Sequence, residues 1–217
     1  MKNLVFFFAL LCSTSLVAQF SFNENGTGIQ SSNSIASGDY SISLGVQTEA
    51  IGDIATAMGA ITTASGTNST AMGYDTNASG EYSTAMGQLT EASGYASTAL
   101  GDQTTASGYW STAMGFVTTA SGGASTAMGW NTTASGEYST AMGGVTRASG
   151  YYSTASGRAT TAEDYLSFVI GVHNKTDETP NPESFSYQNT AFVIGNGGYD
   201  SEGNYVGTSD TFSKPFE

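Results

Sequence analysis

The chain has little of several residue types on which common protein classes depend. Its 217 residues include one cysteine, three prolines, one histidine and five lysine or arginine residues, against 18 acidic residues. Because Cys12 lies in an apolar leader, the mature chain is expected to have no disulfide, and backbone hydrogen bonds and packing must stabilise it. The net charge of −13 repels nucleic acid and anionic lipid, so neither is an expected partner.

Residues for catalysis or metal binding are equally scarce. The single histidine, His173, falls in an expected surface loop, and no histidine or cysteine cluster exists that would bind zinc. The acidic residues at the bends of the repeat form no spaced pair: Asp39, Asp53, Asp75 and Asp102. Four residues near the C-terminus do not match the spacing of an EF-hand calcium loop: Asp200, Glu202, Asn204 and Asp210. We therefore predict no catalytic residue, no metal, no cofactor and no enzymatic activity.

The N-terminus has the features of a signal peptide. Lys2 precedes an apolar run from Leu4 to Leu11, and Ala18 is a small residue at the expected cleavage site. The run is too short for a stable membrane span, and the bulky Leu11 before Cys12 argues against lipid attachment. We predict a signal peptide over 1–18, a lead-in over 19–33, and an exported chain that is secreted or associated with the cell surface or outer membrane without inserting into it.

Two sets of glycines each recur once per repeat, offset by half a repeat, and define a unit of the form Ser-Thr-Ala-Met-Gly-x-x-Thr-Thr-Ala-Ser-Gly-x-x, which is best seen in 111–124. Each half of the unit is a short extended run that ends in glycine and two free positions, so one unit predicts one turn of an all-β solenoid over 34–171. Glycine is expected at the strand ends because the chain reverses there and positive φ costs glycine little. The first-half set comprises Gly45, Gly59, Gly73, Gly87, Gly101, Gly115, Gly129, Gly143, Gly157 and Gly171. The second-half set comprises Gly38, Gly52, Gly66, Gly80, Gly94, Gly108, Gly122, Gly136 and Gly150.

The alternation of side chains assigns the two faces of each strand. Only the side that carries alanine is small in both halves, so it must face the narrow interior. The outward column of the second half is mostly serine, from Ser37 to Ser149. A threonine column is expected inside, with its hydroxyls bonded to backbone groups at the bends: Thr48, Thr62, Thr76, Thr90, Thr104, Thr118, Thr132, Thr146 and Thr160.

The outward column of the first half, here named the Met column, is apolar. It comprises Leu44, Met58, Met72, Met86, Leu100, Met114, Met128, Met142 and Ile170, with Ser156 as an interruption. At ~4.8 Å per rung it forms a stripe of roughly 43 Å, which a monomer would not leave in water. Burying each of these side chains contributes on the order of 1.5–3 kcal/mol. We predict an oligomer seam. The alternative places methionine in the core and alanine outside, and it would set serine opposite methionine in that core.

The unit resembles the head repeat of trimeric autotransporter adhesins of the YadA type, whose form is Ser-x-Ala-[apolar]-Gly-x-x-Ser/Thr-x-Ala-x-Gly-x-x. The match extends from about Ser34 to Gly171. The resemblance implies a left-handed parallel β-roll, a homotrimer packed around a shared axis, and display on a bacterial surface for attachment. The repeat pattern itself requires a seam but does not set the number three. No heptad stalk or anchor strand follows the repeats, so we expect a fragment, or a head that is released or held by another protein.

The repeat loosens after Gly171. Phe168-Val169-Ile170-Gly171 recurs as Phe192-Val193-Ile194-Gly195, which is further along the chain than one rung and leaves room for an insertion. We expect an insertion loop over 173–182, a cap of larger apolar residues over the open end of the roll, and a turn-rich tail, together forming a C-terminal cap over 172–217.

Aromatic residues occupy many of the free positions. Those after second-half glycines are candidate contacts for a protein or glycan ligand: Tyr82, Tyr95, Tyr109, Trp110, Tyr138, Tyr151 and Tyr152. Packing between subunits is the competing explanation, and it is favoured for the aromatics after first-half glycines: Tyr74, Phe116 and Trp130.

The sequence therefore favours an adhesin head that attaches to host or environmental surfaces. Two alternatives remain open. One is an ice-binding solenoid that uses the hydroxylated face, although Asn77, Glu91 and Arg147 interrupt its outward threonine column. The other is a structural spacer or fibre trimer that has no ligand on its bends.

Overall fold

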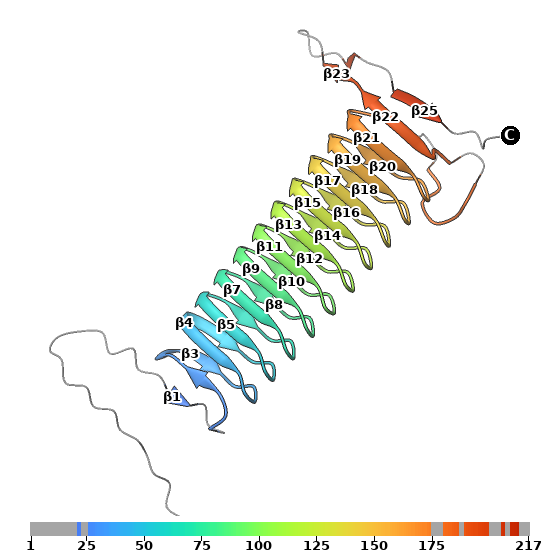
Figure 1. Ribbon diagram of the computed structural model, residues 1–217. Helices are drawn as coiled ribbons and strands as arrows, with labels where there is room; N and C mark the ends of the chain where they lie inside the picture. The colour runs from blue at the N-terminus through green and yellow to red at the C-terminus, as the bar shows by residue number, and fades with distance from the viewer. Residues whose placement is uncertain are drawn as a thin grey trace, which may run out of the picture.

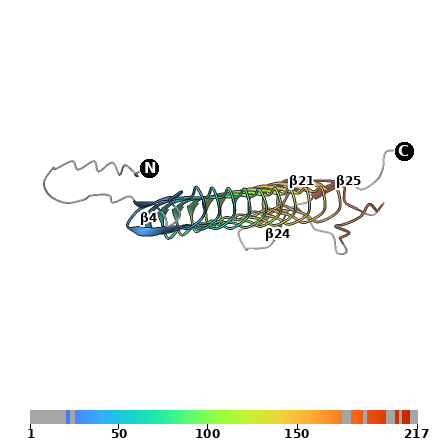
Figure 2. The ribbon, with the colours of Figure 1, turned by 90° about the horizontal axis from the view of Figure 1, so that it is seen from below.

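The computed structural model describes residues 21–22, 26–174, 180–186, 189–199, 205–206 and 209–212. They form an elongated coil of parallel strands that advances from the N-terminal to the C-terminal end (Figures 1 and 2). The expected signal peptide lies outside the described residues. Within them, no helix has both the length and the apolar character needed to cross a membrane.

A regular turn of the coil is a 14-residue rung that contains one long and one short strand, except that one nine-residue strand, Ile42–Ala50, covers both halves of its rung. In the rung at 111–124 these are β13 (Thr112–Phe116) and β14 (Thr119–Ala120). Between residues 56 and 171 neighbouring rungs pair in parallel in one constant register, so that Met114 lies beside Met128, whereas Asn33 to Ala36 pair with a register shift. The predicted all-β parallel solenoid with one repeat unit per rung is confirmed.

The strands before β13 and β14 are β1 (Ser21–Phe22), β2 (Ile29–Gln30), β3 (Asn33–Ala36), β4 (Ile42–Ala50), β5 (Thr56–Ala60), β6 (Thr63–Ala64), β7 (Thr70–Tyr74), β8 (Asn77–Ala78), β9 (Thr84–Gln88), β10 (Glu91–Ala92), β11 (Thr98–Asp102) and β12 (Thr105–Ala106). Those that follow are β15 (Thr126–Trp130), β16 (Thr133–Ala134), β17 (Thr140–Gly144), β18 (Arg147–Ala148), β19 (Thr154–Arg158), β20 (Thr161–Ala162), β21 (Phe168–Val172), β22 (Phe192–Asn196), β23 (Gly198–Tyr199), β24 (Tyr205–Val206) and β25 (Ser209–Phe212).

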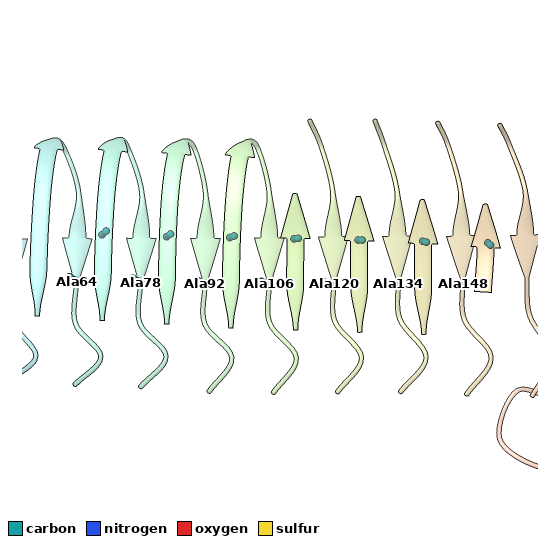
Figure 3. Close-up of a cluster of buried hydrophobic side chains, with 14 of the residues drawn as sticks. Ala64, Ala78, Ala92, Ala106, Ala120, Ala134 and Ala148 are labelled. Carbon is teal, nitrogen blue, oxygen red and sulfur yellow. The ribbon is translucent and has the colours of Figure 1, made fainter. Parts of the chain in front are cut away.

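The interior is lined by small side chains, as the alternation predicts. The alanines of the long strands, such as Ala113, and those of the short strands, such as Ala120, are fully buried. The short-strand alanines form a single row along the axis (Figure 3). The threonine column is also buried, whereas the Met column faces outward. The alternative with methionine in the core is therefore wrong, because the space between the two strands of a rung is filled by alanine, serine and threonine.

The threonine hydroxyls differ from expectation. In the described structure the Oγ1 atoms of the column from Thr62 to Thr160 are buried without a hydrogen-bond partner. The backbone around them is already used between rungs, as where Thr119 N donates to Thr132 O at 2.8 Å. Only Thr48 differs, because Ser43 replaces an interior alanine and its Oγ lies 2.8 Å from Thr48 Oγ1. The expected bonding of this column to backbone at the bends is thus wrong.

The positive φ angles at the bends are not confined to glycine, where the sequence predicted them. At every bend the second free position has a left-handed φ of 48–60°, and it holds residues other than glycine, including Trp110 and Val117. This conformation costs roughly 1–2 kcal/mol per residue. A hydrogen bond between rungs offsets it, as where Trp110 N donates to Tyr95 O at 2.8 Å.

The second-half glycines are required by close stacking. A Cβ on Gly122 would lie 2.0 Å from Gly136 O, and Gly122 has no positive φ. The first-half glycines combine both reasons, since Gly115 has a φ of 125° and its Cβ would lie 2.1 Å from Gly129 O.

Larger residues and side-chain hydrogen bonds appear at the C-terminal end. Val169 and Val193 continue the interior alanine column and are buried. The strands β21 and β22 pair in parallel in the register of the two Phe-Val-Ile-Gly segments, and the rings of Phe168 and Phe192 stack at 5.8 Å. The last described strand, β25, lies antiparallel against β22 (Figure 1), while β23 and β24 pair antiparallel with each other in a separate two-stranded sheet.

Candidate binding surface

The Met column forms one row on the outer face of the long strands, interrupted at Ser156. Its members occupy equivalent register positions from Leu44 to Ile170, so that each side chain lies beside the corresponding one in the next rung. The side chains are partly covered, and Met86 and Met114 are 38 % and 39 % exposed in the single chain. The column is therefore an exposed apolar surface, and its use as a seam stays a prediction.

The opposite face is polar and uneven. It consists of the two-residue strands and the residue that follows each of them, which is serine from Ser65 to Ser149 and Glu163 after β20. Its threonine column is interrupted at Glu49, Asn77, Glu91 and Arg147, on β4, β8, β10 and β18. A flat ladder of hydroxyls, which is the feature that would favour ice binding, is thus interrupted.

The aromatic residues after the second-half glycines line one edge of the roll, here named the second-bend edge. The free positions of successive rungs stack there through hydrogen bonds such as Tyr82 N to Thr67 O at 2.9 Å. The rings form two groups. The first group contains Tyr82, Tyr95, Tyr109 and Trp110, and the second contains Tyr138, Tyr152 and Tyr165.

Within each group the rings contact their neighbours. In the first group Tyr95 lies 5.5 Å from Tyr82, 6.4 Å from Tyr109 and 6.2 Å from Trp110, between ring centroids. In the second group Tyr138 and Tyr152 stack at 4.8 Å with an angle of 3°, and Tyr165 meets Tyr152 edge-on at 5.8 Å. These are the separations of favourable aromatic pairs, so the rings support one another on a rigid backbone.

The rung between the two groups carries Gly123 and Ala124 at its free positions. Tyr109 and Trp110 on one side are 63 % and 64 % exposed, and Tyr138 on the other side is 54 % exposed. A Cβ added to Gly123 would meet only Glu137 Cγ, at 3.9 Å. The sequence repeat shows that this rung differs from its neighbours, but only the stacking shows that it divides the aromatic row.

Two aromatic residues of this edge were missed by sequence reasoning. Tyr165 belongs to the second group, and it escaped notice because Asp164 precedes it where other rungs have glycine. Tyr40 is exposed at the N-terminal end of the edge. Following each column strictly by the repeat period would have found both. Tyr151 was expected here and is half-buried, with its N–H donated to Pro182 O at 2.8 Å.

The charges on the second-bend edge have a single sign. The first free position of the bend holds acidic residues at Asp39, Asp53, Glu81 and Glu137, and no lysine or arginine occurs at the free positions of this edge from Asp39 to Leu166. Both aromatic groups therefore have a carboxylate next to a ring, at Glu81 beside Tyr82 and at Glu137 beside Tyr138.

The other edge is more mixed. Tyr74, Phe116 and Trp130 each follow a residue of the Met column by two positions, and Phe116 and Trp130 pair in register. Trp130 Cε3 would lie 3.7 Å from a Cβ on Gly144, so its ring extends toward the next rung. These rings flank the Met column, and their assignment to packing between subunits stays a prediction.

The described residues hold no group of three or more histidine, cysteine, aspartate or glutamate side chains that is able to bind a metal ion. His173 lies at a bend, half-buried. Of the acidic and amide residues considered for calcium near the C-terminus, Asp200, Glu202 and Asn204 lie outside the described residues.

Comparison with known proteins identifies the repeat. The family model of the YadA head domain repeat matches residues 32–62, 64–90, 92–117, 120–145 and 148–171. No curated protein matches the chain. The matched segments cover more than half of the sequence and coincide with the stacked rungs, and the family is an adhesin-type structural domain and not a known enzyme family. The chain therefore belongs to the family of YadA head domain repeats.

Proposed function

We propose that this chain is an exported adhesin head that attaches to host or environmental surfaces through the second-bend edge. The observation that carries the proposal is the row of exposed aromatic rings, which contact one another across rungs. Rings held by a rigid backbone lose little conformational entropy on binding, and exposed aromatic residues are typical binding hot spots. The family supports the same function.

The proposal includes a homotrimer that packs along the Met column. An interior of alanine, serine and threonine buries little apolar surface, and such small cores are marginally stable alone. The nine apolar side chains of the Met column supply surface for association on each copy, because they lie in register on one face. A trimer would bury this stripe and leave the second-bend edge available for a ligand.

The oligomer is tested by light scattering on the mature chain, where we expect the mass of three copies. The double variant Met86→Asp with Met114→Asp places two charges in the proposed seam and should abolish the trimer. Ser107→Asp with Ser121→Asp, on the opposite face of the roll, is the matched control and should leave the mass unchanged. A stable folded monomer of the unchanged chain would refute the seam.

Attachment is tested by binding of the trimer to cells and to immobilised extracellular matrix. Replacing Tyr109, Trp110, Tyr138 and Tyr152 with alanine removes most of the exposed ring surface and should reduce binding at least about tenfold, since hot-spot residues contribute about 2 kcal/mol or more. The control replaces exposed Leu89 and Val145 on the other edge. Equal binding by the aromatic variant and the unchanged chain would exclude an adhesive role for this edge.

A further inference from the structure

The second-bend edge combines aromatic rings with carboxylates, and this combination selects the sign of its partner. Ring faces carry negative electrostatic potential, so they attract cations. Glu81 and Glu137 are exposed beside rings of the two groups, and the free positions of this edge carry no basic residue. The chain as a whole has a net charge of −13. Acidic glycans and other polyanions are therefore disfavoured, and positively charged groups are favoured.

The stacking of the second group directs one ring face toward the rung at Gly123 and Ala124. Tyr138 lies parallel to Tyr152 at an angle of 3°, so one face of Tyr138 is covered by Tyr152. Its other face is directed toward the preceding rung, where the free positions hold only glycine and alanine. The next aromatic residues beyond that rung are Tyr109 and Trp110, the most exposed rings of the candidate contacts.

The spacing of the rungs fits a single cationic side chain at this position. The backbone positions of Trp110 and Tyr138 are two rungs apart, or ~9.6 Å along the axis, so the rung of Ala124 lies ~4.8 Å from each of their rungs. A cation is attracted by a ring when it lies within about 6 Å of the centroid. The Cγ of Glu137, in the next rung, lies 3.9 Å from the position that a Cβ on Gly123 would take, so an acidic side chain lies next to the rung of Gly123 and Ala124.

We propose that the second-bend edge binds a cationic polypeptide segment, with one arginine or lysine side chain between Trp110 and Tyr138, paired with Glu137, and a second beside Tyr82 and Glu81. This proposal rests on the adhesive function proposed above and specifies its ligand. Ala124 and Tyr82 are three rungs apart, or ~14 Å, which an extended peptide spans in about four residues. The segment recognised is therefore extended and has basic residues about four positions apart.

The test uses the unchanged full chain and synthetic peptides, with binding followed by fluorescence anisotropy. The main probe has two arginines four positions apart in a neutral serine and threonine background. A second peptide has the arginines at adjacent positions, a third carries neutral citrulline instead, and a neutral oligosaccharide is the fourth probe. We expect the main probe to bind best, and to bind more weakly as salt is raised.

Three variants locate the binding. Glu137→Gln should lower the affinity for the main probe about fivefold, and Trp110→Ala should lower it about threefold to tenfold. Gly123→Phe fills the space between the aromatic groups and should abolish binding of the arginine side chain there, with circular dichroism showing that the fold is kept. Asp75→Asn, an exposed carboxylate of the other edge, is the control and should leave the affinity unchanged.

The outcomes separate this proposal from the function on which it rests. If the aromatic variants lose attachment to cells or matrix but the citrulline peptide or the oligosaccharide binds as well as the main probe, the adhesive role stands and the cationic ligand is wrong. Binding that Glu137→Gln and salt leave unchanged overturns the proposal in the same way. If the aromatic variants keep full attachment, the adhesive function itself fails.

Discussion

The regular rungs and the C-terminal end of the roll use different partners for their backbone hydrogen bonds. Between Ile42 and Gly171 each long strand pairs with the backbone of the long strand in the next rung. At the end, side chains replace the missing rung. Asn174, which lies one repeat period after Thr160, accepts a hydrogen bond from Thr161 N at 2.7 Å and donates one to Thr161 O at 2.9 Å. The side-chain amide thus pairs with the edge of β20 as a further strand would.

Asp164, which precedes Asn174 in the chain, also uses its side chain to hydrogen-bond backbone groups at the end of the roll. It occupies the position of a second-half glycine, and Asn181 and Thr190 lie next to it where a further rung would otherwise stack. Its carboxylate accepts hydrogen bonds from Asn181 N at 2.7 Å and Thr190 N at 2.9 Å. Glycine is therefore required at this position where another rung stacks on it. Where the repeat stops, a side chain fits at the same position and covers the edge of the sheet, which would otherwise be open to association with another strand.

The largest effect is expected from a glycine inside the repeat. Gly122→Ala places a Cβ 2.0 Å from Gly136 O, a contact with backbone that only a shift of the rungs relieves. We expect a loss of about 4 kcal/mol or more in the free energy of unfolding. Urea denaturation at one fixed protein concentration measures it. Gly123→Ala is the matched control, because its Cβ would make only an ordinary contact with Glu137 Cγ at 3.9 Å, and it should stay within about 0.5 kcal/mol of the unchanged chain.

A smaller and local effect is expected at the end of the roll. Asp164→Ala removes the acceptor for two backbone N–H groups and should destabilise the cap by about 3 kcal/mol. Hydrogen exchange should show lost protection at Asn181 and Thr190 while the central rungs keep theirs. Glu183→Ala, an exposed residue of the same segment, is the control. Equal exchange in both variants would show that the carboxylate does not hold the cap.

The smallest effect is expected from the interior hydroxyls, and its sign differs between rungs. Thr118→Val removes a buried hydroxyl that has no partner in the described structure, and it should stabilise the fold by about 1 kcal/mol. Thr48→Val removes a hydroxyl bonded to Ser43 and should destabilise it by a similar amount. Thermal unfolding of the two variants measures the difference. A loss of stability at Thr118 would show that its hydroxyl has a partner after all.

Much of the roll could be predicted because its pattern repeats. Alternation alone placed Ala113 inside and Met114 outside, and the duplicated Phe-Val-Ile-Gly segment indicated the register of β21 and β22. The hydrogen bonds of Asn174 and Asp164 were not predicted, since each occurs once and joins residues that meet only after the chain has left the repeat. The physical reason that glycine is needed at position 122 was also not predicted. A Cβ there would collide with a carbonyl oxygen of the next rung, and the sequence of a single rung does not indicate that contact.

The sequence by itself determined the rung, its two faces and its family, because period-2 alternation and a regular repeat are local properties that any extended chain must express. Only the tertiary structure decided which residues meet across rungs. It showed that the threonine hydroxyls are buried without partners in the described part of the chain, that Asp164 and Asn174 close the end, and that the rung at Gly123 divides the aromatic row. These contacts depend on the few ångströms between successive turns, a distance set by backbone hydrogen bonding along the axis and not by any single residue.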